Sequence, residues 1–189
     1  MYAMAQAMQA LAKTEVPEKP RTTFAVTVTG GGTSINAIPN EVWMDVDMRS
    51  QSAAELARLE AHFQAVVHEA VAAENAARST RSGSITVAFT LVGDRPAGET
   101  ALDSDLVQLA TAAITAHGFE PSHEFSSTDA NIPMSLGVPA IKMGSGGSGG
   151  RAHSLEEWID VEPTASVRGM AAGLTAILAV AAWLRSREP

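Results

Sequence analysis

Alternating apolar and polar residues predict strands in the first half of the chain. Phe24, Val26 and Val28 alternate with threonines and an alanine, and residues 42–48 repeat this period of two. The pattern returns a third time in ITVAFTLV, residues 85–92. The eleven residues between the first two stretches, GGGTSINAIPN, are too many for a tight hairpin turn. We therefore expect three half-buried strands, the first two joined by a long loop.

Apolar residues at helical spacing predict two helices around these strands. Residues 2–13 have this spacing and are followed by VPEKP, whose prolines end a helix. Ser52 is the expected N-cap of a second helix that carries a stripe of Leu59, Phe63 and Val66. The order helix, strand, strand, helix, strand is that of a ferredoxin-like split βαβ fold without its first strand.

The stretch GDRPAGET divides the chain into predicted domains 1–94 and 95–189. After it, short strands and helices alternate, which is typical of α/β layers. Two short strands are too few for a complete doubly wound sheet, so the second domain is expected to be part of an α/β fold. The expected elements are helices at 103–117 and 163–185, and short strands at 123–126 and 137–143.

The apolar run GMAAGLTAILAVAAWL, residues 169–184, lies between two arginines. It is shorter than the ~20 residues that span a bilayer, and alanine and glycine dominate it. We therefore expect a buried helix and no membrane partner.

Composition excludes several classes of function. The net charge of −8 and the absence of a basic run argue against nucleic acids and anionic membranes as partners. The chain has no cysteine, which excludes disulfides and thiolate metal sites. Such a composition is compatible with the cytoplasm, where we expect the protein to reside.

The segment GSGGSGG, residues 144–150, is either a flexible tether or a shaped loop that approaches a ligand. A tether joins self-sufficient domains, but the residues that follow it are too few for a separate core. A loop at the carboxyl end of a buried α/β strand is a usual place for ligands. We therefore favour the shaped loop, whose free backbone N–H groups would suit an anion or oxyanion.

His153 follows the glycine segment and precedes Ser154 and Glu157, which match the capping box S-x-x-E. Ser154 could simply cap a short helical turn while the imidazole packs nearby, or His153 could face a ligand. The segment STDANIP, residues 127–133, offers the same choice: Thr128 or Asp129 could cap a short helix, or the polar side chains could line the cleft beside the glycine loop. The other histidines lack a second metal ligand at suitable spacing.

Three motifs in order resemble the C-terminal part of a zinc exopeptidase and amidohydrolase family. They are GGTSINAIPNEVWMDVDMRS, STDANIP and GVPAIKMGSGGSGGRAHSLEEWID. The family includes peptidase T, aminoacylase and bacterial glutamate carboxypeptidases. The resemblance implies that residues 1–94 are a ferredoxin-like lid and dimerisation domain lacking its first strand. Residues 95–189 would be the C-terminal segment of the catalytic domain, and the chain would form a homodimer through the lid.

The same resemblance implies a set of site residues. His153 falls at the family's last metal-ligand histidine, in a site that holds two Zn²⁺ ions in the intact enzyme. Substrate contacts are implied for Asn36, Asp129, Asn131, Gly146 and Gly147. Asn131 replaces an arginine that binds a carboxylate in many relatives, which favours the peptidase T-like branch. Small peptides or N-acyl amino acids are the implied substrates.

The remaining metal ligands and the catalytic glutamate have no match in this sequence. One imidazole cannot hold zinc in a site of three or four ligands. We therefore expect the isolated chain to be inactive, as part of a larger zinc hydrolase. Two alternatives remain open: a non-enzymatic dimerisation or interaction protein derived from that scaffold, and a metal-free anion-binding domain that uses the glycine loop.

Overall fold

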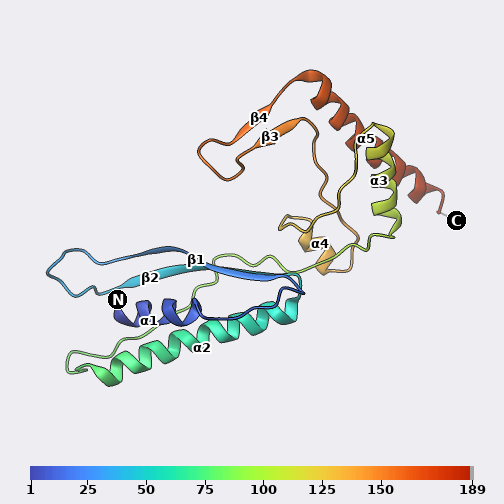
Figure 1. The fold of residues 1–189 in the computed structure, drawn as a ribbon. Helices are drawn as coiled ribbons and strands as arrows, with labels where there is room; N and C mark the ends of the chain where they lie inside the picture. Colours follow the sequence, from blue (N-terminus) through green and yellow to red (C-terminus); the bar gives the residue numbers. More distant parts are fainter. Residues whose placement is uncertain (188–189) are drawn as a thin grey trace. The chain divides into compact units, whose positions relative to one another are not determined.

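The computed structural model describes residues 1–187 and contains two compact units, Met1–Ala97 and Gly98–Pro189. Unit 1 runs from blue to green in Figure 1, and unit 2 runs from green to red. Both units mix helices with small sheets, which confirms the predicted mixed α/β class. Each unit is described separately below.

Unit 1 consists of a two-stranded antiparallel sheet with two helices on one of its faces (Figure 1). Its core contains small and branched apolar side chains from both helices: Ala7, Leu11, Val66, Val67 and Ala70. Phe24, Val26 and Met44 of the sheet pack against this cluster. The elements are α1 (Tyr2–Leu11), β1 (Thr22–Gly31), β2 (Val42–Ser50) and α2 (Ala53–Ala77).

The predicted start of the long helix is confirmed. The Ser52 side chain accepts a hydrogen bond from the Glu55 backbone N–H at 3.4 Å, as an N-cap does. At the other end, Asn75 bonds both backbone groups of Ile85, at 2.8 and 2.9 Å. This pair of bonds ties the chain that leaves α2 back onto the helix.

The prediction of a third strand at residues 85–92 is wrong. These residues carry no strand pairing, although Val87 packs against the core and the Phe89 ring lies 5.6 Å from the Phe63 ring, edge to face. The alternation of apolar side chains is therefore used for packing on α2. A strand also needs a hydrogen-bonded neighbour, and no described residue provides one here.

Unit 2 is built around the packing of two helices, α3 (Asp105–Ala116) and α5 (Pro163–Arg185). Ala110, Ala113 and Ala176 form the centre of the contact, and Ile141 and Met143 pack against it. The small side chains let the helix backbones approach closely. The remaining elements are a short helix, α4 (Asn131–Ser135), and two three-residue strands, β3 (Ser148–Gly150) and β4 (Trp158–Asp160).

The predicted helices of unit 2 are confirmed, but its predicted strands at 123–126 and 137–143 are not formed. Ile141 and Met143 still pack under the helices, as a buried strand would, but the described residues place no strand beside them. The only sheet of unit 2 among the described residues is the antiparallel β3–β4 hairpin. The sequence did not predict it, because Ser-Gly-Gly has no apolar alternation.

The prediction that the last apolar helix is buried is also wrong for this chain. Only 17% of the most apolar 18-residue window in Pro163–Arg185 is buried, and α5 is long and apolar enough to cross a membrane by length and composition. Its covered residues are small: Gly169, Ala172 and Ala176. Leu174 and Ile177 are more than half exposed, because the described part of unit 2 covers only one stripe of the helix.

Candidate functional site

The glycine segment is a packed loop whose last residues form a strand. Gly146 and Gly147 adopt positive φ angles of 81° and 76°, which glycine tolerates best. A Cβ atom on Gly146 would overlap the backbone of Gly169 in α5, and a Cβ atom on Gly169 would overlap Gly146. Ser148–Gly150 then pairs with β4. Glycine is therefore required at position 146 because the backbone of the loop contacts the backbone of α5.

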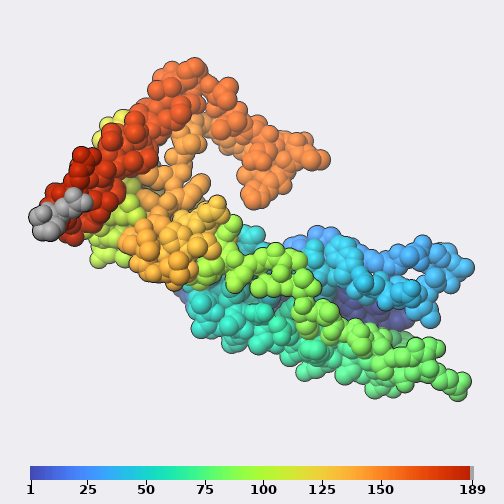
Figure 2. Space-filling view, turned by 180° about the vertical axis from the view of Figure 1, so that it is seen from behind, coloured from blue at the N-terminus to red at the C-terminus, as the bar shows by residue number. Residues whose placement is uncertain are grey.

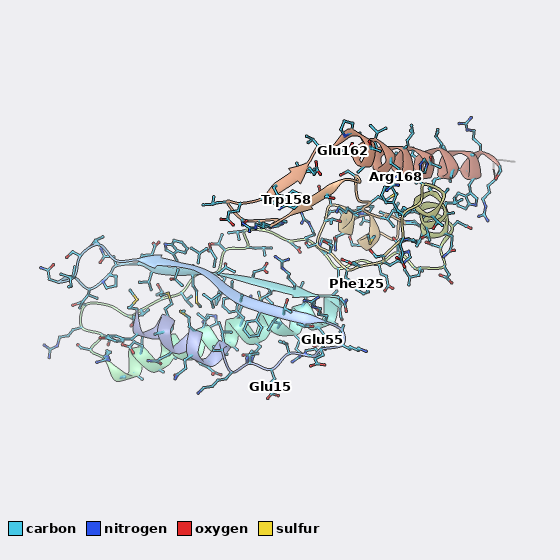
Figure 3. The ribbon with its side chains drawn as sticks, turned by 45° about the horizontal axis from the view of Figure 1, so that its top comes forward. Glu15, Glu55, Phe125, Trp158, Glu162 and Arg168 are labelled. Carbon is cyan, nitrogen blue, oxygen red and sulfur yellow. The ribbon has the colours of Figure 1, made fainter. Side chains whose placement is uncertain are left out.

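The N-terminus of α5 beside this loop is capped by the chain itself. Both carboxylate oxygens of Glu162 accept hydrogen bonds, one from the Thr164 backbone N–H and one from the Ala165 N–H, each at 2.9 Å. These bonds lower the pKa of the Glu162 carboxyl, with the bond from Ala165 contributing most. Figure 3 labels Glu162 where the helix begins. Two of the N–H groups that an external anion would need are therefore already bound.

His153 lies in the loop that joins β3 to β4, in an unusual backbone conformation. Its φ angle is 66°, and that of Arg151 is 55°; both are left-handed values that a non-glycine residue rarely adopts. Ser154 closes the turn by donating its hydroxyl to the Arg151 carbonyl at 2.7 Å. Arg151 also forms an ion pair with Glu156. Strain of this kind often accompanies functional positions, and here it sets the direction in which His153 leaves the backbone.

The capping box predicted at Ser154 and Glu157 starts no helix. Ser154 Oγ accepts from the Glu156 N–H at 3.2 Å, and the Glu157 N–H donates to the Ser154 carbonyl at 3.2 Å. These bonds define two turns, after which the chain enters β4. Trp158 then lies against Gly150, where a Cβ atom would be 2.8 Å from the indole nitrogen. Local hydrogen bonds and the glycine of β3 therefore fix the ends of the His153 loop.

The side chains that the structure describes do not form a zinc site by themselves. Within residues 1–187, no group of three or more His, Cys, Asp or Glu side chains is placed to hold a metal ion. His153 is exposed and lies among turn residues. Because zinc sites in proteins use at least three protein ligands, His153 fits zinc only as one member of a larger set.

A shallow hollow of about 590 Å³ lies beside the segment 127–133. Its lining includes Thr128, Asp129 and Pro133 from this segment together with Ile141 and Lys142. Of the residues predicted to contact substrate, only Asp129 lines this hollow. The hollow combines a carboxylate with an ammonium group, which suits a ligand that carries both charges.

Asn131 has a structural role in this segment. Its side-chain oxygen accepts the Thr128 backbone N–H at 2.9 Å, and the residue begins α4. Thr128 in turn accepts the Ala130 N–H at 3.3 Å, while the N-cap position itself is Ala130. The predicted capping role is therefore replaced by a side-chain turn just before the helix, and the substrate contact of Asn131 stays a prediction.

Asn36 lies in the exposed loop between β1 and β2 of unit 1. Its side-chain oxygen accepts the Ser34 hydroxyl, which closes a local turn. Within unit 2, Gly146 and Gly147 lie against α5, and neither they nor His153 line the Asp129 hollow. The sequence suggested that the glycine loop and the segment 127–133 line one cleft. In unit 2 the glycine loop and the Asp129 hollow are formed by two separate groups of residues.

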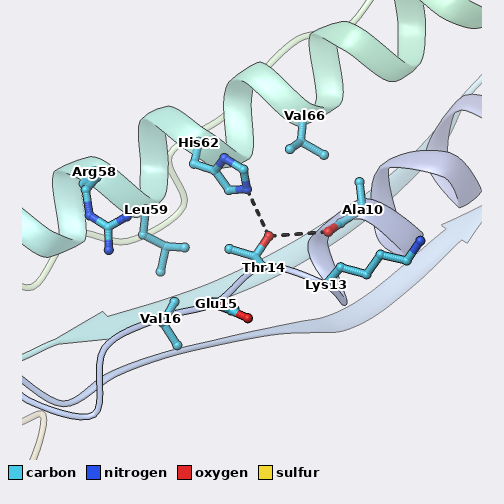
Figure 4. A pocket seen from close by; sticks show the side chains of 9 residues that line it. All are labelled: Ala10, Lys13, Thr14, Glu15, Val16, Arg58, Leu59, His62 and Val66. Carbon is cyan, nitrogen blue, oxygen red and sulfur yellow. Dashed lines mark hydrogen bonds between the residues drawn. The ribbon is translucent and has the colours of Figure 1, made fainter.

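Sequence reasoning missed a second hollow of about 320 Å³ in unit 1, between the end of α1 and α2 (Figure 4). His62 and Thr14 are joined there by a 3.0 Å hydrogen bond, and Lys13 and Arg58 add two cationic side chains. The residues come from segments more than forty positions apart, so no local motif indicated the hollow. His62 serves here to fix the chain after α1.

Comparisons with known proteins are consistent with this architecture. Residues 1–75 match the model of the peptidase dimerisation domain of the M20 family. The fold resembles the crystal structure of the aminopeptidase PepT from Bacillus cereus, with a TM-score of 0.66 and 21% identity. That match covers 95% of this chain and 44% of the PepT chain, so this chain spans less than half the length of that relative. No curated protein matches the sequence.

The match to the family model shows what residues 1–75 are related to. The match to PepT shows a similar fold. A dimerisation domain indicates self-association as the role of unit 1. Residues 1–75 of this chain are therefore related to the dimerisation domain of the M20 peptidases.

Proposed function

We propose that this chain supplies the dimerisation domain and one zinc ligand, His153, of a hydrolase that cleaves peptide or N-acyl amino acid amide bonds. The observation that carries the proposal is the dimerisation-domain match over residues 1–75, followed in the same chain by a unit of PepT-like fold. Because the chain spans 44% of PepT, the activity belongs to a protein that also contains the residues missing here. The absence of cysteine is compatible with a cytoplasmic enzyme.

His153 is proposed as a metal ligand because of its place in the turn. The left-handed backbone at Arg151 and His153 holds the imidazole on an exposed loop between two short strands. A ligand to a metal that other segments also bind must be accessible in this way. Zinc, when bound, would polarise an amide carbonyl or activate a water molecule.

Substrate binding is proposed for two further places. In the hollow beside α4, Asp129 and Lys142 would bind the ammonium and carboxylate ends of a peptide, and Lys142 would bind the carboxylate of an N-acyl amino acid. Asn36, on the exposed loop of the dimerisation domain, would hydrogen-bond a carbonyl or carboxylate of the substrate. Gly146 and Gly147 hold their own loop against α5. In this proposal, the loop held in this way lies near the substrate.

Zinc titration by calorimetry tests the ligand assignment. The 189-residue chain should bind zinc only weakly, because it offers one ligand. An extended protein, in which this chain is joined to a segment that carries the missing metal ligands, should bind two zinc ions. His153→Ala should weaken zinc binding by the extended protein, whereas His123→Ala should leave it unchanged, because His123 bonds Thr111 on the surface of unit 2. Tight binding of two ions by the 189-residue chain would contradict the proposal.

A second candidate function is a non-catalytic dimerisation protein. The observation in its favour is that the family model covers the dimerisation domain alone. Sedimentation equilibrium distinguishes dimers from monomers, and hydrolysis assays on the extended protein separate the two functions. A dimer without zinc binding or hydrolysis in either form would favour the second function.

A further inference from the structure

The hollow in unit 1 lies between the end of α1 and the first half of α2 (Figure 4). Its nine lining residues come from two short segments, 10–16 and 58–66, so it is formed by these two helices and the loop that follows α1. Arg58 and His62 are exposed, and α2 (teal) lies at the surface of unit 1 in Figure 2. The volume of about 320 Å³ is that of a small-molecule site, and such a molecule can enter it directly from solvent.

Hydrogen bonds between the two segments fix the shape of this hollow. The Thr14 backbone N–H donates to the Leu11 carbonyl at 2.9 Å, in the turn that ends α1. The Thr14 hydroxyl donates to the Ala10 carbonyl at 3.4 Å, and its oxygen is 3.0 Å from His62 Nε2 on α2. These bonds hold the loop after α1 against α2, so the hollow is preformed.

The floor of the hollow is apolar. Leu59 and Val66 are only 3% and 8% exposed, and they lie two turns apart on the same face of α2. Val16 is half-buried and adds an apolar side chain from the loop. Because water is poorly bound by such a surface, the hollow favours a ligand with an aliphatic or aromatic body.

Besides His62, three charged side chains line the hollow: Lys13, Glu15 and Arg58. Arg58 already forms an ion pair with Glu55 at 2.6 Å. Lys13 and Glu15 have opposite charges and no ion-pair partner among the described residues, and Figure 4 shows them leaving the loop in different directions. A simple anion would be repelled by Glu15 and a simple cation by Lys13, so the hollow favours a ligand that carries both charges.

We propose that this hollow binds a free amino acid with an apolar side chain, in its zwitterionic form. Lys13 binds the carboxylate, and Glu15 binds the α-ammonium group. The side chain of the amino acid lies against Leu59, Val66 and Val16. This site is independent of the proposed hydrolase function, because none of its residues belongs to the site proposed for hydrolysis.

The experiment uses the 189-residue chain and three probes with the same branched aliphatic body. L-leucine carries both charges, isocaproate lacks the ammonium group, and isoamylamine lacks the carboxylate. Titration followed by the NMR shifts of backbone amides measures the affinity and locates the site. We expect leucine to shift amides of residues 10–16 and 58–66. Each probe with a single charge should bind about tenfold more weakly, because it loses one charge-assisted hydrogen bond and leaves its partner on the protein unpaired.

Substitutions that remove one charge provide the matched test. Glu15→Gln should weaken binding of leucine and strengthen binding of isocaproate, whereas Lys13→Gln should weaken binding of leucine and strengthen binding of isoamylamine. Glu18→Gln and Lys19→Gln make the same charge changes at exposed positions that do not line the hollow, and they should leave all affinities unchanged. A gain of affinity for one probe cannot result from misfolding, so it separates recognition from loss of structure.

Three results would overturn the proposal. One is equal affinity for leucine and both singly charged probes, which would leave only a non-specific apolar contact. Another is no binding of leucine up to its limit of solubility, or amide shifts confined to residues outside 10–16 and 58–66. The third is an unchanged affinity for leucine in both Glu15→Gln and Lys13→Gln, which would exclude the two groups assigned to the zwitterion.

Discussion

The contact between the glycine loop and α5 can be tested by substituting Gly169. An alanine Cβ there would overlap Gly146 and lie 2.7 Å from both the Gly146 nitrogen and the Ser145 carbonyl oxygen. All of these are backbone atoms, so the overlap cannot be relieved by rotating a side chain. Gly173 lies one turn later in α5, and a Cβ atom there meets nothing within 4 Å. Gly173→Ala is therefore the matched control in the same helix.

The expected magnitude follows from two opposing terms. Replacing glycine by alanine within a helix stabilises it by about 0.8–1.0 kcal/mol. Overpacking of a filled contact costs roughly 1–3 kcal/mol. Because the helix term is common to both variants, their difference isolates the overlap: Gly169→Ala should be about 1–3 kcal/mol less stable than Gly173→Ala.

Urea unfolding followed by tryptophan fluorescence measures this difference. Trp158 and Trp183 lie in unit 2, so a Trp43→Phe background removes the signal of unit 1. With a slope of about 1 kcal/mol per molar urea, the midpoints of the two variants should differ by roughly 1–3 M. Equal midpoints would refute the packing argument and favour residues 144–147 as a free tether.

Three further predictions concern local interactions. Ser52→Ala removes the side-chain cap of α2 and should lower the stability of unit 1 by about 1 kcal/mol in thermal unfolding; an unchanged midpoint would contradict the cap. The pKa of the Glu162 carboxyl is lowered in the folded chain, so the stability that its carboxylate contributes is fully present above the unfolded pKa and is lost as the pH falls through the lower folded pKa. The stability difference between the parent and Glu162→Gln should therefore shrink below about pH 4 in acid titrations, and a constant difference would exclude the linkage. Asn75→Ala removes both bonds to Ile85 and should speed exchange of the Ile85 amide without affecting α5; an unchanged rate at Ile85 would show that packing on α2 alone holds this segment.

The elements that the sequence predicted correctly depend on short-range patterns. β1 and β2 follow from strict alternation, and α2 follows from Ser52 and an apolar stripe, both confirmed. The three strands that did not form, at 85–92, 123–126 and 137–143, share a different cause. Apolar alternation predicts which side chains are covered, but a strand also requires a neighbouring backbone, and that neighbour is not encoded in the segment itself.

The candidate site was predictable only in part. The glycines and Ser154 indicated a shaped turn before β4, and the structure contains one. The left-handed backbone of His153 was not predictable, because it arises from the hairpin that surrounds the residue. Nor was the contact of Gly146 with Gly169, which joins residues that share no local motif. Sequence periodicity records local conformation, whereas such contacts depend on tertiary packing.

The central proposal is that His153 is a metal ligand of an amide hydrolase. Its most direct test is the rate at which the extended protein hydrolyses a panel of dipeptides and N-acyl amino acids. We predict zinc-dependent hydrolysis that His153→Ala abolishes and that His123→Ala leaves at the parent rate. Full activity of the His153→Ala protein would contradict the account.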